Sequence, residues 1–302
     1  MRLRKNYSKI SPETATAMRE QKFINISKSS FIDSDYKGAF SELGLTSIDA
    51  VFSFNAGRNL AKNNLAKYRT RLEFEINSPA VTVFLKRYDK PPVLAQLRSW
   101  LAAHCRVSCA AFSVKSANEL AAAGINTPKT LFYGEQWRAF FEKRSFIITE
   151  KIPNAESLER KLPDCFDGRA IVEKMKLRRN FITQLASFIR KFHETDYRHR
   201  DLYLSHIFYI DSGDFYLIDL ARAFKPIVRR RRFRIKDIAQ LYYSAPARYF
   251  SRTDRLRFYF SYIGREDKLT GKDKTFIRRL INKAMRMARH DEKHGREVPF
   301  ES

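Results

Sequence analysis

The first regular pattern along the chain is a series of stretches with alternating positions or with β-branched and aromatic residues, which is typical of strands. It covers residues 47–54, 65–76 and 80–88, and turn-forming segments at 55–59 and 77–80 separate the three stretches. The pattern predicts an antiparallel meander of three strands.

Two stretches rich in alanine and leucine come next and predict helices. They span residues 93–104 and 112–123, and a glycine and a proline after the second supply the stop signals. Residues 131–133 and 140–150 have the composition of strands again. We therefore expect a small five-stranded lobe over residues 47–150, with a helical insertion after its third strand.

The second half of the chain has a mainly helical pattern. Apolar residues recur at spacings of three or four between Ile182 and Phe192. Two short apolar stretches, 207–210 and 215–218, flank the turn sequence DSGD and predict a hairpin. The basic sequence beyond Arg234 predicts helices to about residue 290.

These patterns divide the chain into four parts. We expect a polar N-terminal lead-in over residues 1–35, an N-lobe with nucleotide-binding strands over 36–150, a C-lobe with the catalytic loop and metal site over 151–290, and a frayed tail over 291–302.

The charge of the chain points to its partner. The 302 residues include 58 Lys and Arg against 33 Asp and Glu, so the formal net charge is +25, which favours an anionic partner such as nucleic acid, acidic lipid or polyphosphate. An apolar content of 44% excludes a disordered chain.

Three cysteines without a C-x-x-C pair favour neither a disulfide framework nor a zinc site. With no export signal or long apolar run in the sequence, we expect a cytoplasmic protein.

The residues that point to chemistry surround the predicted hairpin. The tripeptide H-R-D ends at Asp201, His206 precedes the first strand of the hairpin, and Asp219 follows the second. Antiparallel pairing brings the residue before the first strand next to the residue after the second. Two carboxylates and an imidazole are therefore expected to converge, an arrangement that suits a base beside a metal ion.

The same spacing occurs in protein kinases, where an H-R-D aspartate is the base, a metal ligand lies five positions later, and a second metal-binding aspartate follows a hairpin. Here His206 takes the five-residue position, at which protein kinases have asparagine. A kinase also needs a lysine on the third strand of a small preceding lobe, and Lys86 lies on the third predicted strand. The order of these features predicts an α+β, two-lobed protein-kinase-like fold, with a small antiparallel-sheet N-lobe and a mainly helical C-lobe.

Longer motifs across residues 40–250 point to one family more closely than to the protein kinases. They are NAGRNLAKNNLAKYRTR, FLKRYDKPP, AAAGINTP, SFIITE, HRDLYLSH, LIDLAR and RRRRFRIKDIAQLYYSA. In them the chain resembles the lipopolysaccharide core kinases of the Kdo/WaaP family, which act on heptose or Kdo and have a protein-kinase-like fold. HRDLYLSH, with histidine at the metal position, is the most family-specific of these motifs.

The resemblance implies ATP-dependent phosphorylation of an inner-core sugar of lipopolysaccharide, with a sugar hydroxyl as acceptor. It also implies a role for each matching residue. Asp201 would be the catalytic base, Lys86 would hold the nucleotide phosphates, and His206 and Asp219 would bind Mg²⁺. Glu150 would close the hinge between the lobes, where backbone groups meet adenine.

Other positions have supporting roles in this interpretation. Backbone groups near Gly57 and Asn59, together with Lys62, would cradle phosphate, although such a turn is also found in plain hairpins. His199 would orient the catalytic loop, and Asp237, as a buried acid, would brace it.

One position departs from the family pattern. Ser113 occupies the helix position where the family usually has a glutamate that pairs with the strand lysine, and Glu119 is the only acid on that predicted helix. Six residues is too far for a neighbour on the same helix face. The acid that pairs with Lys86 is therefore left open.

Two basic segments follow the hairpin. The first places eight cations within fifteen residues after the metal-binding aspartate: Arg222, Lys225, Arg229, Arg230, Arg231, Arg232, Arg234 and Lys236. Since arginine binds carboxylate and phosphate bidentately, we expect Arg222 and Arg229 to Arg232 to contact an acidic glycolipid rather than form only a solvated face. The second, near residues 277–289, is a basic amphipathic helix that packs on the large lobe and can attract anionic membrane.

Two alternatives stay open at this point. An atypical protein kinase or small-molecule kinase of the same fold would share every catalytic residue, and an inactive kinase-like module would bind anionic membrane through its charge. The intact Asp201, Asp219 and Lys86 disfavour the inactive module. Nucleic acid is disfavoured because the aromatic residues do not alternate with the basic runs. We expect a peripheral enzyme on the cytoplasmic face of the inner membrane, whose partners are the core glycolipid and anionic lipid.

Overall fold

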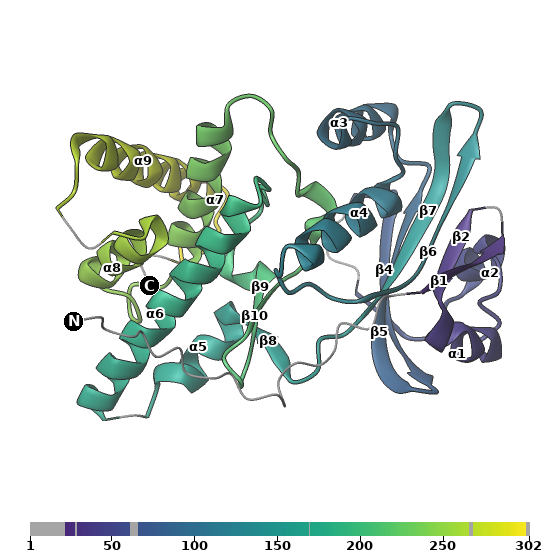
Figure 1. Ribbon diagram of the computed structural model, residues 1–302, viewed down its shortest axis with the longest axis horizontal. Coiled ribbons are helices and arrows are strands. Elements are labelled where there is room, and N and C mark those ends of the chain that lie inside the picture. The colour runs from purple at the N-terminus through teal and green to yellow at the C-terminus, as the bar shows by residue number, and fades with distance from the viewer. Residues whose placement is uncertain (1–21, 28, 61–65, 169, 266–267, 300–302) are drawn as a thin grey trace, which may run out of the picture.

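The structure is a computed structural model that describes residues 22–27, 29–60, 66–168, 170–265 and 268–299. Within them a sheet-rich N-lobe and a helix-rich C-lobe lie side by side, on the right and left of Figure 1. This arrangement confirms the expected α+β class.

The N-lobe is built on a sheet of seven antiparallel strands in the described part of the chain, in the order β1–β2–β6–β7–β5–β4–β3. The strands are β1 (Phe23–Ser27), β2 (Ser30–Asp33), β3 (Arg58–Asn59), β4 (Arg69–Asn77), β5 (Ala80–Asp89), β6 (Thr130–Arg138) and β7 (Phe141–Glu150). The tight turn between β4 and β5 sets their register. Asn77 pairs with Ala80, and the pairing continues without a shift to Arg69 and Tyr88.

The prediction of a polar lead-in over residues 1–35 is wrong where the structure describes it. β1 and β2 pair with each other, and β2 adds to the edge of β6. Ile32 is fully buried in the N-lobe core, and Ile24 and Ile26 pack against that core. This short apolar segment therefore belongs to the sheet, while residues 1–21 lie outside the described residues.

The predicted strand over residues 47–54 is also wrong, because this segment forms helix α2 (Ile48–Ser53). The Ser47 side chain accepts a hydrogen bond from the Ala50 N–H, and Asp49 places a negative charge in the first turn. Both features stabilise a helix N-terminus, and here they outweigh the β-branched and aromatic residues that suggested a strand. The first strand of the meander is instead the short β3.

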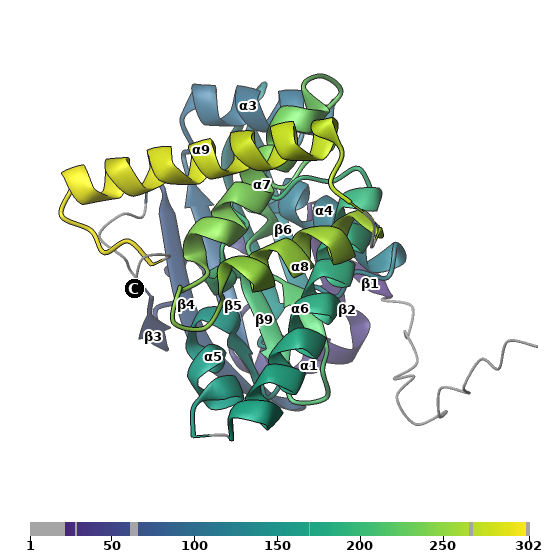
Figure 2. The same cartoon turned by 90° about the vertical axis from the view of Figure 1, so that its left-hand side faces the viewer.

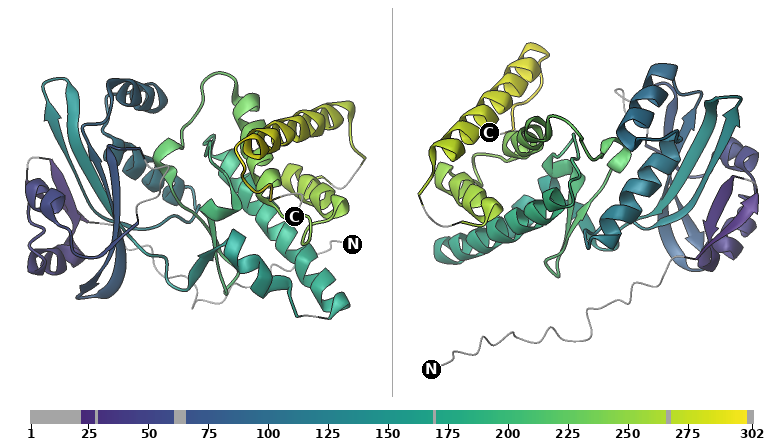
Figure 3. Two further views of the ribbon diagram at one scale, coloured as in Figure 1. Left: turned by 180° about the vertical axis from the view of Figure 1, so that it is seen from behind. Right: turned by 45° about the horizontal axis from the view of Figure 1, so that its top comes forward.

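Other helices lie around the sheet and between the lobes. They are the short η1 (Ser34–Tyr36), α1 (Lys37–Glu42), α3 (Val93–Ala103) and α4 (Cys109–Ala122). The first half of α4 packs against the sheet, where Ala110 and Val114 meet Ile147, whereas Ala117 and Leu120 belong to the core of the C-lobe. Figure 3 shows α4, in blue, between the sheet and the green segments of the C-lobe, so the two lobes share this helix.

The C-lobe combines a small sheet, ordered β10–β9–β8, with a group of helices. Its strands are β8 (Ala155–Ser157), β9 (Ile207–Ile210) and β10 (Phe215–Leu217). Its helices are α5 (Leu158–Phe166), α6 (Ile171–Glu194), η2 (Leu204–His206), η3 (Leu220–Arg222), α7 (Arg230–Ser244), α8 (Arg252–Ile263) and α9 (Gly271–Lys293). The apolar face of α6 predicted between Ile182 and Phe192 is buried in the core.

Helix α9 is the basic amphipathic helix expected near the C-terminus, and Figure 2 shows it, in yellow, lying across α7. It buries Phe276, Leu280, Ala284 and Ala288, which gives it the predicted packing on the large lobe. Among the helices that the structure describes, none combines the length and apolarity that crossing a membrane requires.

Candidate active site between the lobes

The β9–β10 hairpin brings His206 and Asp219 together. Ile207 pairs with Leu217 in the antiparallel register, and the Ile218 N–H donates to the His206 carbonyl at 3.1 Å. Asp219 then turns away from the strand with a φ of 57°, a left-handed conformation that is strained for a residue other than glycine. The convergence derived from antiparallel pairing is therefore present in the fold.

An ion pair joins the two lobes at this point. Lys86, on β5 of the N-lobe, places its Nζ 3.4 Å from Oδ1 of Asp219, and Arg71, on β4, places Nη2 3.0 Å from Oδ2. The charge of Lys86 holds the pKa of the Asp219 carboxyl far below its ordinary value, and Arg71 and His206 act in the same direction. Asp219 is therefore ionised, between two cations of the N-lobe.

Arg71 is the site residue that the sequence analysis missed. It lies directly opposite Lys86 in the β4–β5 register, so both side chains leave the same face of the sheet. The sequence contained the information needed to find Arg71, because the turn near residue 78 determines which residues of β4 and β5 pair. The sequence left open which acid pairs with Lys86. In the structure this acid is Asp219.

The two helix positions considered as partners of Lys86 have other contacts. The Ser113 hydroxyl donates to the Cys109 carbonyl of the preceding turn at 3.2 Å. Glu119 binds Lys225 through a 2.6 Å ion pair. Helix α4 thus contacts the C-lobe through Glu119.

Asp201 lies beside cations of the C-lobe. Nη1 of Arg222 is 2.9 Å from each carboxylate oxygen of Asp201, and Nζ of Lys236 is 3.9 Å from Oδ1. Arg222 is the last residue of η3, three positions after Asp219. Asp201, the predicted base, therefore forms an ion pair with Arg222, the first arginine of the basic run.

The hydrogen bond of His206 decides which of its nitrogens is available. Nδ1 lies 2.7 Å from the backbone carbonyl oxygen of Asp201. Because a carbonyl only accepts, Nδ1 carries a proton, and in the neutral tautomer Nε2 has a free lone pair. A metal-binding histidine is typically oriented in this way.

The donor set at this position fits Mg²⁺. It offers a carboxylate from Asp219 and Nε2 of His206, and Mg²⁺ commonly binds one or two carboxylates together with waters and substrate phosphates. Imidazole is a softer ligand than Mg²⁺ prefers, so Asp219 is the stronger donor. No group of three or more His, Cys, Asp or Glu side chains gathers for a metal within the described residues.

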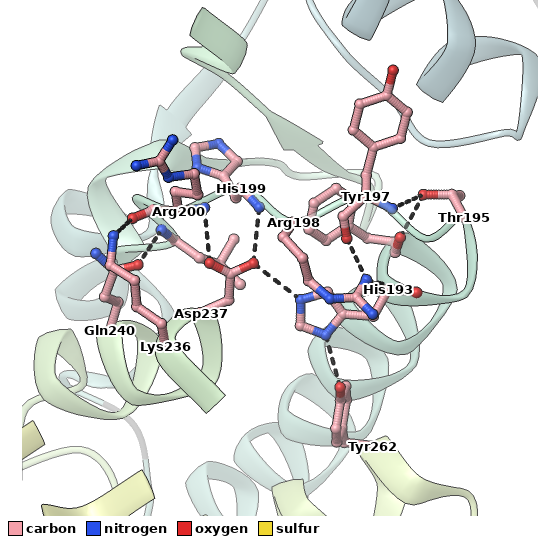
Figure 4. Close-up of polar contacts among 12 residues, drawn as sticks. His193, Thr195, Tyr197, Arg198, His199, Arg200, Lys236, Asp237, Gln240 and Tyr262 are labelled. Atoms are coloured by element: carbon pink, nitrogen blue, oxygen red, sulfur yellow. Dashed lines mark hydrogen bonds and ion pairs between the residues drawn. The ribbon is translucent and has the colours of Figure 1, made fainter. Parts of the chain in front are cut away.

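Asp237 holds the catalytic loop in place from below, as Figure 4 shows. Its Oδ2 accepts the His199 N–H and its Oδ1 accepts the Arg200 N–H, both at 2.8 Å. Asp237 and His199 are fully buried. The two hydrogen bonds fix the backbone just before Asp201, which is what a bracing acid requires.

Two histidines extend this hydrogen-bond network. Nε2 of His199 lies 2.9 Å from the Ile218 carbonyl, which ties the loop to the residue before Asp219. Nε2 of His193 is 3.3 Å from Asp237, and its Nδ1 is 2.7 Å from the Tyr262 hydroxyl. These contacts are those of structural histidines.

The turn expected to cradle phosphate needs glycine for a steric reason. Gly57 has a φ of 112°, and a Cβ atom there would lie 2.5 Å from the Glu73 carbonyl oxygen. Asn59 pairs with Leu72 in β3. Lys62, the third residue of this expectation, lies outside the described residues.

Glu150 lies at the end of β7, where the chain passes from one lobe to the other. Its N–H donates to the Lys129 carbonyl at 2.9 Å, and its carboxylate accepts from the Tyr36 hydroxyl at 3.4 Å. Burial raises the pKa of Tyr36 to about 12, and Glu150 adds to this effect. Glu150 thus lies at the connection between the lobes, and its role next to adenine stays a prediction.

Arg229 to Arg232 are exposed at the beginning of α7, downstream of Arg222. Arg230 forms a 3.5 Å ion pair with Asp196. Positive charges at a helix N-terminus are unfavourable toward the helix dipole, so this cluster does not serve the stability of α7.

Comparison with known proteins gives a family and a fold. The model of the lipopolysaccharide kinase (Kdo/WaaP) family matches residues 66–262. The lipopolysaccharide core heptose(I) kinase WaaP of Escherichia coli is 30% identical over 180 residues, which cover 57% of this chain and 62% of that protein. The Pseudomonas aeruginosa protein of the same name is 32% identical over 150 residues, covering 47% of this chain and 55% of that protein.

A solved structure of WaaP in complex with acyl carrier protein shares the fold. Its TM-score is 0.60 at 23% identity, and the match covers 79% of this chain and 91% of that chain. The chain spans somewhat more than half of the length of the curated relatives that it matches.

Proposed function

This chain belongs to the lipopolysaccharide kinase (Kdo/WaaP) family, and we propose that it transfers the terminal phosphate of ATP to a hydroxyl of an inner-core sugar of lipopolysaccharide. The observation that carries the proposal is the ion pair between Lys86 and Asp219. This ion pair joins a lysine of one lobe to an aspartate of the other, which supports a site in which Lys86 would bind nucleotide phosphates and Asp219 would bind Mg²⁺.

The N-lobe residues bind the nucleotide in this proposal. Lys86 and Arg71 both contact Asp219, so the group carries one positive charge in excess. Entering phosphates would take over these two cations, which lie partly buried where electrostatic attraction is stronger than in water. Mg²⁺, held by Asp219 and His206, would neutralise charge on the phosphate oxygens.

The C-lobe residues act on the acceptor. The sugar hydroxyl oxygen forms a bond to the terminal phosphorus, the bond from that phosphorus to ADP breaks, and the hydroxyl proton passes to Asp201. Asp237 keeps Asp201 in position through the two backbone hydrogen bonds described above. Arg222 and the exposed Arg229 to Arg232 would bind phosphate or carboxylate groups of the glycolipid.

The acceptor also defines the proposed location and partners. Lipopolysaccharide core is attached to a lipid, so the enzyme would act as a peripheral protein at the cytoplasmic face of the inner membrane, where its charge of +25 favours anionic lipid. The matched relatives are heptose(I) kinases, which makes heptose the first sugar to test. The partner in the solved relative is acyl carrier protein, which the sequence analysis did not predict. We keep the glycolipid as the proposed partner because Arg222, the first arginine of the basic run, lies beside Asp201.

Incubation with labelled ATP, Mg²⁺ and purified core oligosaccharides tests the proposal. Acceptors that end in heptose or in Kdo identify the sugar, and mass spectrometry of the product identifies the hydroxyl. Asp201→Asn is the control, since an amide keeps the shape of the side chain and cannot take the proton. Transfer to neither sugar by the wild-type chain, or equal transfer by Asp201→Asn, would contradict the proposal.

A further inference from the structure

Helix α3 exposes a continuous apolar face. Its side chains Val93, Leu94, Leu97 and Leu101 are all exposed, while Gln96 and Ala103 form its buried side. At about 100° of rotation per residue, these four side chains occupy a stripe about 100° wide. A stripe of this width is what a helix normally turns toward a core, so its exposure marks a contact surface.

A group of aromatic rings borders one side of this stripe. Trp100 of α3 stacks on Phe141 with ring centroids 5.9 Å apart and meets the exposed Phe140 edge to face at 5.3 Å. Arg106 lies 4.1 Å above the ring of Trp137. Tryptophan and arginine side chains are typical of the boundary between water and lipid, because each combines an apolar body with a polar end.

A loop of the C-lobe extends the same surface. Ile227 and Val228 are exposed between Lys225 and Arg229. The His104 ring, directly after α3, lies 3.4 Å from the Lys225 carbonyl, which ties this loop to the end of the helix. Figures 1 and 2 show α3 and the segment before α7 at the same end of the molecule.

Cations surround the apolar side chains and connect them with the catalytic loop. Arg98 and Arg106 are exposed beside the helix, and Lys225 and Arg229 flank the loop tip. Burial lowers the pKa of Arg200, and the charges of Arg222 and Arg98 act in the same direction, so this edge of α3 lies within electrostatic reach of the loop that carries Asp201.

We propose that Val93, Leu94, Leu97, Leu101, Ile227 and Val228, here called the insertion surface, enter an anionic phospholipid bilayer. Charge complementarity selects this partner: aliphatic side chains from two elements stand among cations, in a chain of net charge +25. Acyl chains take up the aliphatic groups and lipid phosphates bind the surrounding Arg and Lys side chains. The inference rests on the proposed function and deepens it, because it orients Asp201 toward an acceptor that is anchored in the same bilayer.

A second exposed apolar pair provides a matched control. Ile171 and Val172 in the first turn of α6 are 78% and 81% exposed, and Leu101 and Ile227 of the insertion surface are 76% and 69% exposed. The first turn of α6 lies at the bottom of Figures 1 and 2, opposite α3. Replacing either pair by two aspartates changes the net charge by the same amount. The two double variants therefore differ only in where the new charges lie.

The test is co-sedimentation of the full chain with vesicles of phosphatidylcholine alone or mixed with phosphatidylglycerol. Wild type and the control Ile171→Asp/Val172→Asp are expected to bind the mixed vesicles equally and the neutral ones at least tenfold more weakly. Leu101→Asp/Ile227→Asp is expected to lose at least tenfold in affinity for the mixed vesicles. All three proteins should phosphorylate a soluble core oligosaccharide at the same rate, which also shows that they are folded.

Two results would overturn the inference. One is equal binding of mixed vesicles by wild type and Leu101→Asp/Ile227→Asp. The other is a wild-type chain that binds neither kind of vesicle while it phosphorylates the soluble acceptor, and this result would leave the proposed function intact. A wild-type chain that binds mixed vesicles through the insertion surface without any transfer would support the inference and contradict the proposed function.

Discussion

A single guanidinium nitrogen of Arg222 lies 2.9 Å from both carboxylate oxygens of Asp201. The side chain of Arg222 is about half exposed, so the pair is open to solvent. An acceptor hydroxyl that reaches Asp201 therefore meets Arg222 at the same moment. The proposed base and the proposed acceptor-binding arginine therefore form one ion pair.

Arg222→Ala is expected to raise KM for the glycolipid acceptor by about tenfold, because one charge-assisted contact contributes about 1.5 kcal/mol. KM for ATP should stay unchanged, since Arg222 lies on the side of Asp201. Steady-state kinetics with each substrate varied measures both values. Arg190→Ala, which removes a cation that pairs with Glu194 on α6, is the control. An increase confined to KM for ATP would assign Arg222 to the nucleotide.

Asp219→Ala is expected to reduce turnover at least about a hundredfold, because it removes the carboxylate that is proposed to bind Mg²⁺ and that faces Lys86 and Arg71. MgATP should raise the melting temperature of the wild-type chain through binding, and this increase should disappear in the variant. Asp214→Ala, in the exposed turn of the same hairpin, should behave like wild type. Normal MgATP-dependent turnover in Asp219→Ala would refute the metal assignment.

His206→Asn should keep turnover within about tenfold of wild type, a change of about 1.4 kcal/mol in the barrier. An asparagine oxygen is a harder ligand than imidazole and suits Mg²⁺ better. His206→Leu removes the donor altogether and should lose far more. If the asparagine and leucine variants are equally inactive, His206 has a role other than metal binding.

The stability of the chain should fall as the pH drops below about 6.5. Burial lowers the pKa of His193 below its ordinary value of 6.5, although Asp237 opposes this shift, and Arg198 and Arg234 act with burial. Between the two pKa values the unfolded chain binds a proton that the folded chain does not, so protonation favours unfolding.

Urea unfolding at pH 7.5, 6.5 and 5.5 measures this dependence. His193 contributes at most about 1.4 kcal/mol per pH unit to the loss of unfolding free energy. His193→Asn should therefore show a shallower decline than wild type, from a lower starting stability, because its contacts with Asp237 and Tyr262 are weakened. Parallel declines of both proteins would assign the effect to other groups, of which buried His199 is the first.

Gly57→Ala is expected to lower the unfolding free energy by about 1–3 kcal/mol, because a Cβ atom at this position would lie 2.5 Å from the Glu73 carbonyl oxygen. Gly213→Ala is the matched control, since Gly213 also has a positive φ but faces open space. It should cost about 1 kcal/mol from backbone strain alone. Equal losses in thermal unfolding would show that the turn around Gly57 relaxes to admit a methyl group.

The part of the site that could be predicted from the sequence depends on local pairing. His206 and Asp219 are separated by one hairpin, and the antiparallel register is enough to bring them together. The same reasoning, applied to β4 and β5, would have placed Arg71 opposite Lys86. The contact of Lys86 with Asp219 could not be derived in this way, because it depends on how the two lobes pack.

The wrong predictions have physical reasons of two kinds. β2 pairs with β6, which lies about a hundred residues later in the chain. The local sequence near Ile32 therefore does not indicate that this segment is a strand. Residues 48–53 contain β-branched and aromatic residues that are typical of a strand, but the Ser47 cap and Asp49 favour a helix and carry more weight than this composition. The exposed apolar face of α3 has the same periodicity as the buried face of a helix. Only the structure shows that this face is exposed.

Helix α4 contributes side chains to both cores, with Val114 on the sheet side and Leu120 on the C-lobe side. Unfolding of either lobe would therefore remove part of the core of the other, so the two lobes share one cooperative transition. The chain boundary near residue 150, which separates the lobes in the sequence, is not a point at which the protein can be cut into two parts that fold independently.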